Sequence, residues 1–302
     1  MYSLPVFVLL LLTVTTGATA GILRGVYSKT NPMTGKNLWR FNFFQNLACC
    51  CTIAVIGLCS GFSFHFSRFS VLLGVLLAAA NILSILFMLK AQAIGPFSYT
   101  TVIVSLSAII PTFSGMLFFR ERVSWIQMIG VGLMICCILL SPEHHDDESR
   151  SVGLRWITCC ALAFIGSGTT GVTQKFHQNS AEHHSEFAAL LLTCMFLSML
   201  FSGFELILEH KKNPTDTPDH PTRSQLLIPL IAGLCFAFPH TINLFLSGKL
   251  PAIVFFPIVN LCPMLLQLLY AVFVFKEKLS LRRKIGILFG ILATIVISGI
   301  IG

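Results

Sequence analysis

Long apolar stretches alternate with short polar segments along the whole chain. Continuous apolar runs of about 20 residues favour membrane-spanning helices, whereas a transmembrane barrel shows short alternating segments. The pattern predicts an all-α membrane protein with ten transmembrane helices. The predicted spans are Leu4–Tyr27, Phe41–Gly61, Val71–Ala91, Phe97–Phe119, Trp125–Leu140, Leu154–Thr173, Phe187–Leu208, Leu226–Leu246, Ile253–Phe275 and Ile285–Ile301.

Composition supports a bilayer as the solvent of this chain. Of the 302 residues, 55% are hydrophobic and 11% are charged. About a quarter of the residues in a soluble domain are charged. The net charge of +8 lies almost wholly in short loops and at the ends of the predicted spans. We therefore expect contacts with membrane lipids and no nucleic acid partner.

Two short patterns occur twice, about half a chain apart. TTGATA begins at Thr15 and TTGVTQ at Thr169, while FRERVSWIQMIG begins at Phe119 and FKEKLSLRRKIG at Phe275. The longest hydrophilic joint, SPEHHDDESRS, lies between the two copies. We predict a first five-helix repeat at 1–141, a hydrophilic linker at 142–152 and a second five-helix repeat at 153–302.

The number of spans in each repeat has a geometric consequence. Because five is odd, the second repeat enters the membrane from the opposite side, so the two repeats are inverted. Inverted repeats are typical of secondary transporters, in which both halves build one site near the middle of the bilayer.

These features resemble the drug/metabolite transporter superfamily, and within it the EamA-type ten-helix transporters. The resemblance rests on two five-helix repeats, each with an aromatic-x-Glu-x-x-Ser turn, at Glu121 and Glu277, before a last helix that contains glycine. It implies a transporter, in particular an exporter, of small metabolites, amino acids or amphipathic drugs. Related small multidrug proteins use a glutamate in the first helix, which this sequence lacks. Proton-driven cation efflux of that kind is therefore in doubt.

Polar residues inside the apolar spans are the candidates for substrate binding. His240 and Asn243 follow Pro239 and lie three apart, so they share one helix face. Lys175 either takes part in the site or extends to the membrane interface. Small hydroxylated residues could equally serve helix packing. The full set of candidates is His240, Asn243, Asn260, Gln267, Asn81, Tyr99, Thr16, Thr170, Gln174 and Lys175.

Two further groups of residues are candidates for functional sites. The His-rich stretches EHHDDE at 143–148 and EHHSE at 182–186 contain metal-ligand side chains, but we expect them to be solvated linkers. Glu121 and Glu277 are interpreted as helix caps, with gating as the alternative. No cofactor and no metal site is expected. The eleven cysteines lie in the predicted spans and are expected to serve as apolar filler.

Function classes other than transport remain as alternatives. The spans contain no constellation typical of a membrane enzyme, so we expect no enzymatic activity. A non-transporting membrane scaffold or receptor-like protein is the main alternative to a transporter. A metal-ion transporter is a less favoured one. We expect a monomer or weak homodimer.

The location and orientation follow from the loops. Short loops favour a multi-pass protein of the cell membrane, specifically a bacterial cytoplasmic membrane. Fifteen Lys and Arg residues lie in or beside odd-numbered loops and five in or beside even-numbered loops. The positive-inside rule then places both termini outside, whereas the family resemblance places them inside.

Overall fold

The computed structural model describes residues 4–33, 35–118, 124–140, 150–212, 221–276 and 280–297, and these ranges are helices joined by short turns. The elements are α1 (Leu4–Thr30), α2 (Gly35–Ser60), α3 (Arg68–Ile94), α4 (Phe97–Ser105), the short 3₁₀ helix η1 (Leu106–Ala108), α5 (Ile109–Phe118), α6 (Trp125–Leu140), α7 (Arg150–Gln178), α8 (Phe187–Lys212), α9 (Arg223–Ser247), α10 (Ala252–Phe273) and α11 (Leu281–Ile297). Each predicted span corresponds to one helix, except the fourth.

The fourth span is divided into α4, η1 and α5. Pro111 has no N–H, so it cannot donate to the carbonyl of Ser107 four residues earlier, and the helix tightens locally. By contrast, α9 continues through Pro229 and Pro239 as one helix. Pro239 therefore does not interrupt α9, although it leaves one carbonyl without its helical partner.

The helices are suited to a bilayer. Among the described residues, eight helical segments are long and apolar enough to cross a membrane, with α4, η1 and α5 together forming one of them. The remaining two predicted spans, α6 and α11, are described over 16 and 17 residues. Large apolar side chains such as Leu58, Leu72 and Phe204 lie on the outside of the bundle, where lipid would cover them.

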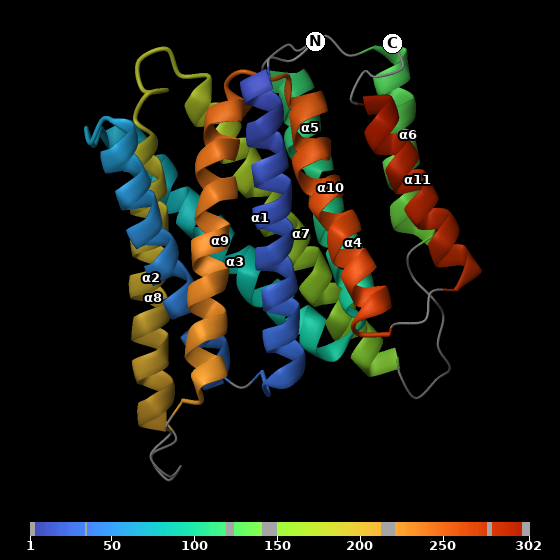
Figure 1. The fold of residues 1–302 in the computed structure, drawn as a ribbon, viewed down its shortest axis with the longest axis horizontal. Helices are drawn as coiled ribbons and strands as arrows, with labels where there is room; N and C mark the ends of the chain where they lie inside the picture. The colour runs from blue at the N-terminus through green and yellow to red at the C-terminus, as the bar shows by residue number, and fades with distance from the viewer. Residues whose placement is uncertain are drawn as a thin grey trace.

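The helices pair in a pattern that is unchanged when the two halves are exchanged. The contact of α1 with α9 is equivalent to that of α7 with α3. In the same way, α2 packs against α9 and α8 packs against α3. Finally, α1 packs against α10, and α7 packs against α5. α2 pairs with its counterpart α8, and α6 with its counterpart α11, at opposite edges of the bundle (Figure 1). In Figure 1, α1 starts at the top of the view and α7 at the bottom. These are two inverted five-helix repeats, as the sequence predicts.

The repeated TTG pattern marks equivalent helix contacts in the two halves. Gly17 in α1 and Gly171 in α7 are the glycines of the two patterns. A Cβ at Gly17 would lie 3.7 Å from Pro239 and 3.8 Å from Pro263, and one at Gly171 would lie 2.9 Å from Pro111. At Gly171 the absence of a Cβ lets the proline ring of α5 approach closely, whereas a Cβ at Gly17 would make ordinary van der Waals contact.

Several predicted features fall at or beyond the edges of the described ranges. α7 begins at Arg150, within the predicted linker 142–152. The EHHDDE stretch and both glutamate turns, at Glu121 and Glu277, lie outside the described residues. The repeat boundaries therefore stay a prediction.

The described cysteines are free thiols, and the most buried of them lie in apolar surroundings. Cys49 of α2 and Cys194 of α8 are fully buried in a cluster with Leu190 and Met195. In this setting cysteine fills space as a small apolar residue does.

Candidate functional site

A cavity of about 190 Å³ lies between the two repeats, near the middle of the bundle. The first repeat lines it with α1, α3, α4, η1 and α5, and the second with α7, α9 and α10. Its polar lining residues are Thr13, Arg24, Asn81, Ser84, Ser105, Ser107, Ser167, Thr170, Gln174, His240, Asn243, Asn260 and Gln267.

Seven of the ten candidates from the sequence line this cavity. They are His240, Asn243, Asn260, Gln267, Asn81, Thr170 and Gln174. They come from α3 in the first repeat and α7, α9 and α10 in the second, so the cavity depends on the tertiary fold.

His240 is held between α7 and the aromatic side of the cavity. Its ring is 8% exposed, and its Nδ1 lies 3.4 Å from Nε2 of Gln174. The ring of Phe236, one turn earlier in α9, meets His240 edge to face with centroids 4.2 Å apart. The imidazole is therefore fixed in orientation at the cavity wall.

The third helices of the two repeats line the cavity with the same face. Asn81 and Ser84 of α3 lie three residues apart and line the cavity, as His240 and Asn243 do in α9. α3 and α9 are the third helices of their repeats. Residues three apart share a helix face, so each repeat presents the same face of its third helix.

Three candidates lie outside the lining. Thr13 and Gly17 of α1 line the cavity, but Thr16 does not. The hydroxyl of Thr16 donates to the carbonyl of Leu12 at 2.6 Å. Tyr99 is 5% exposed and packs edge-on against Trp156.

Lys175 is the third of these candidates. Its Nζ donates to the carbonyls of Ser247 at 2.9 Å and Leu250 at 3.0 Å. Because Ser247 is the last residue of α9, the cation lies at the negative end of that helix. Lys175 joins α7 to the end of α9, and it is 4% exposed.

Arg24 is a cavity residue that sequence reasoning missed. It was not among the ten candidates, yet it is 7% exposed and lines the cavity. Its Nε donates to Oε1 of Gln45 at 2.9 Å, and its Cζ lies 4.1 Å from the centroid of the Phe236 ring. The available signal was simple, because the predicted span Leu4–Tyr27 already contained this arginine.

A polar network lies behind the cavity and joins α2, α3 and α8. Asn81 donates to Asn46, Asn46 donates to Asn42, and Asn42 donates to Ser202. The amides of α2 were not among the candidates. Buried hydrogen bonds between helices fix their relative positions where water is excluded.

Several polar atoms at the cavity have no protein partner. They include Oγ1 of Thr13, Nη2 of Arg24, Oδ1 of Asn243 and Oε1 of Gln267. A buried polar atom without a partner is destabilising. A polar solute in the cavity would provide the missing hydrogen bonds.

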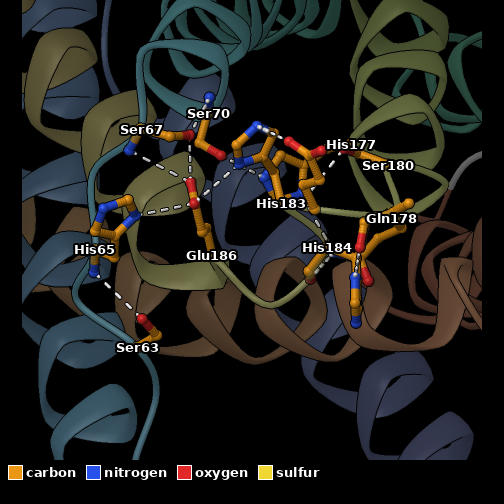
Figure 2. Close-up of polar contacts among 12 residues, drawn as sticks. Ser63, His65, Ser67, Ser70, His177, Gln178, Ser180, His183, His184 and Glu186 are labelled. Carbon is orange, nitrogen blue, oxygen red and sulfur yellow. Dashed lines mark hydrogen bonds and ion pairs between the residues drawn. The ribbon is translucent and has the colours of Figure 1, made fainter.

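A second polar cluster lies at one end of the bundle, where the α2–α3 and α7–α8 connections meet (Figure 2). Glu186, just before α8, is at its centre and is 5% exposed. His65 and His183 each place Nδ1 3.0 Å from Oε1 of Glu186, and the hydroxyl of Ser67 donates to Oε2. The EHHSE stretch was expected to be a solvated linker, but Glu186 is a buried anchor between the two repeats.

The environment of Glu186 favours its ionised form. Burial alone would raise the pKa of this carboxyl, but hydrogen bonds from Ser67, Ser70, His183 and His65 outweigh burial. The pKa of Glu186 therefore lies below its usual range.

The metal interpretation of the His-rich stretches finds no geometric support in the described ranges. Within them, no group of three or more His, Cys, Asp and Glu side chains is arranged to hold a metal ion. His183 instead stacks on Phe69, with ring centroids 5.0 Å apart.

Comparisons with known proteins agree with this architecture. None of the curated proteins matches the chain. A solved structure, described only as the crystal structure of a protein, is similar over 98% of this chain and 96% of that one, with 14% sequence identity and a TM-score of 0.62. At that identity the likeness concerns the fold alone. The family model of the EamA-like transporter family matches residues 3–141 and 154–299, the two repeats. The chain therefore belongs to the EamA-like transporter family, a family of membrane transporters within the drug/metabolite transporter superfamily.

Proposed function

We propose that the protein is a secondary transporter that moves small polar metabolites by alternating access. The observation that carries the proposal is the cavity itself, because both repeats line it with polar side chains from the inner parts of their long apolar helices. Inverted repeats that share a central site are the structural basis of alternating access, in which one repeat rocks against the other.

The helix pairing supports a second conformation of similar energy. Since α1 packs on α9 as α7 packs on α3, exchanging the conformations of the two repeats gives an arrangement with equivalent packing. That arrangement would expose the cavity to the opposite side of the membrane. We take export across the cell membrane as the direction, in line with the resemblance described above.

The Glu186 cluster is the proposed closure at one end of the bundle. It joins the α2–α3 connection of one repeat to the α7–α8 connection of the other. Opening the cavity toward this end requires these hydrogen bonds to break.

Flux measurements test the proposal. We expect purified protein in proteoliposomes to transport solutes from a labelled metabolite panel. His240→Ala and Asn243→Ala should lower the flux at unchanged protein abundance, because both side chains line the cavity. The loss of one hydrogen bond to solute predicts a decrease of about tenfold for Asn243→Ala.

The repeats provide a matched control. Thr170 and Thr16 occupy equivalent places in the two TTG patterns, but only Thr170 lines the cavity. Thr170→Ala should lower flux, whereas Thr16→Ala should leave it unchanged. Full flux in His240→Ala, Asn243→Ala and Thr170→Ala would exclude this cavity as the transport site.

A further inference from the structure

Arg24 is the one permanently charged residue among the side chains that line the cavity in the described part of the chain. It lies in α1, inside an apolar segment that runs from Val6 to Thr30. A charged side chain in this position costs several kcal/mol unless something compensates it. The role of this charge therefore depends on the residues that contact Arg24.

The protein holds the guanidinium in place without neutralising it. Gln45 accepts from Nε at 2.9 Å, and Cζ of Arg24 lies over the Phe236 ring, 4.1 Å from its centroid. Within the described ranges, no carboxylate forms an ion pair with Arg24. Its Nη2 is buried and has no hydrogen-bond partner.

Arg40 shows how a buried arginine is satisfied elsewhere in the same protein. It is also 7% exposed, but its Nη1 donates to Oδ1 of Asn37 at 3.2 Å and to Oε1 of Gln225 at 3.3 Å. Arg40 does not line the central cavity. Of these two buried arginines, the one that lines the cavity has an amino group without a hydrogen-bond partner.

We propose that Arg24 binds the carboxylate of the transported solute, so that the substrate class is small organic acids, including amino acids. The guanidinium presents parallel N–H donors that match the two oxygens of a carboxylate. With Nε bound to Gln45 and Cζ over the Phe236 ring, the amino groups remain for the solute. A bound carboxylate would supply both the missing charge and the missing acceptor.

The assignment rests on the proposed transport function, but binding tests it separately from flux. The probes are carboxylates from acetate to adipate and the common amino acids, each beside the corresponding carboxamide. Thermal unfolding of detergent-purified full-length protein gives the stabilisation and, from its concentration dependence, the Kd. We expect at least one carboxylate to raise the melting temperature while its carboxamide does not.

Three variants separate binding from folding. Arg24→Gln should raise the Kd of the carboxylate at least about tenfold, since a charge-assisted pair is lost. Arg24→Lys keeps the charge but not the paired donors, and should give an intermediate Kd. Arg40→Gln, the matched control, should keep the wild-type Kd. Without ligand, Arg24→Gln should melt no lower than the wild type because it removes an uncompensated charge, whereas Arg40→Gln should melt lower.

Equal stabilisation by a carboxylate and its carboxamide would overturn the proposal. So would an unchanged Kd in Arg24→Gln, or a panel in which no carboxylate stabilises the wild type. The protein could instead transport uncharged or cationic solutes at a rate that Arg24→Gln does not change. This result would support the transport function but contradict carboxylates as the substrate class. Carboxylate binding at Arg24 without flux of any solute would instead support the binding site and contradict transport.

Discussion

At the scale of single residues, neighbouring side chains of one helix have different roles. Gln174 and Lys175 are neighbours in α7, yet one lines the cavity and the other joins α9. Adjacent residues on a helix point about 100° apart, so the outcome depends on which face of α7 meets the second repeat.

Glu186 provides a residue-scale prediction with a defined pH dependence. Folding lowers the pKa of its carboxyl, so the ionised form contributes stability at neutral pH. This contribution begins to decline as the pH falls below the ordinary carboxyl range, about 4.3. Glu186→Gln should therefore destabilise the protein by about 1–3 kcal/mol at pH 7, and the difference should shrink in acid.

Thermal unfolding of both proteins in detergent, across a pH series, measures this difference. Glu182→Gln is the control, because the Glu182 side chain is 86% exposed and lies 3.9 Å from His183. It should unfold like the wild type at every pH. If the loss of stability in Glu186→Gln were the same from neutral to acid pH, the charge of Glu186 would not be what stabilises the protein.

At the scale of elements, the sequence was most informative where the bilayer restricts the choices. Backbone groups in lipid must bond within their own segment, so ten long apolar runs could be assigned as ten helices. The break at η1 was not predicted. Pro111 breaks the fourth span, whereas Pro239 leaves α9 continuous, and a sequence pattern does not distinguish two such prolines. Packing against neighbouring helices decides the difference.

Helix packing gives the element-scale prediction. A Cβ at Gly166 of α7 would lie 2.7 Å from the backbone nitrogen of Ser84 and 2.8 Å from the carbonyl oxygen of Ala80, both in α3. Backbone atoms cannot rotate away, so Gly166→Ala should push α7 from α3 and cost about 1–3 kcal/mol.

Gly132 of α6 is the matched control, because a Cβ there meets no atom within 4 Å. Gly132→Ala should be neutral or stabilise by up to about 1 kcal/mol, as alanine is the better helix former. Thermal unfolding in detergent reports both variants. Equal melting temperatures for the two would mean that α3 and α7 are not in the close contact described here.

At the scale of the whole molecule, the repeat explains both the fold and the site. α1 begins and α11 ends at the same end of the bundle (Figure 1), as an even number of spans requires. The cavity lies where the repeats meet, and its lining takes Thr13 and Gly17 from α1 and Ser167 and Gly171 from α7, the equivalent positions of two copies of one sequence pattern. The two patterns could be paired from sequence, but which of their residues face the cavity required the packed helices.

The central claim is that one cavity between inverted repeats opens alternately to the two sides of the membrane. Ser84→Cys, in a background without other cysteines, places a thiol on the cavity wall. A membrane-impermeant thiol reagent is then applied to oriented proteoliposomes from one side or the other, with and without a transported solute. The account predicts that Cys at this single position reacts from both sides and that the solute slows both reactions. Reaction from one side only, under every condition, would contradict it.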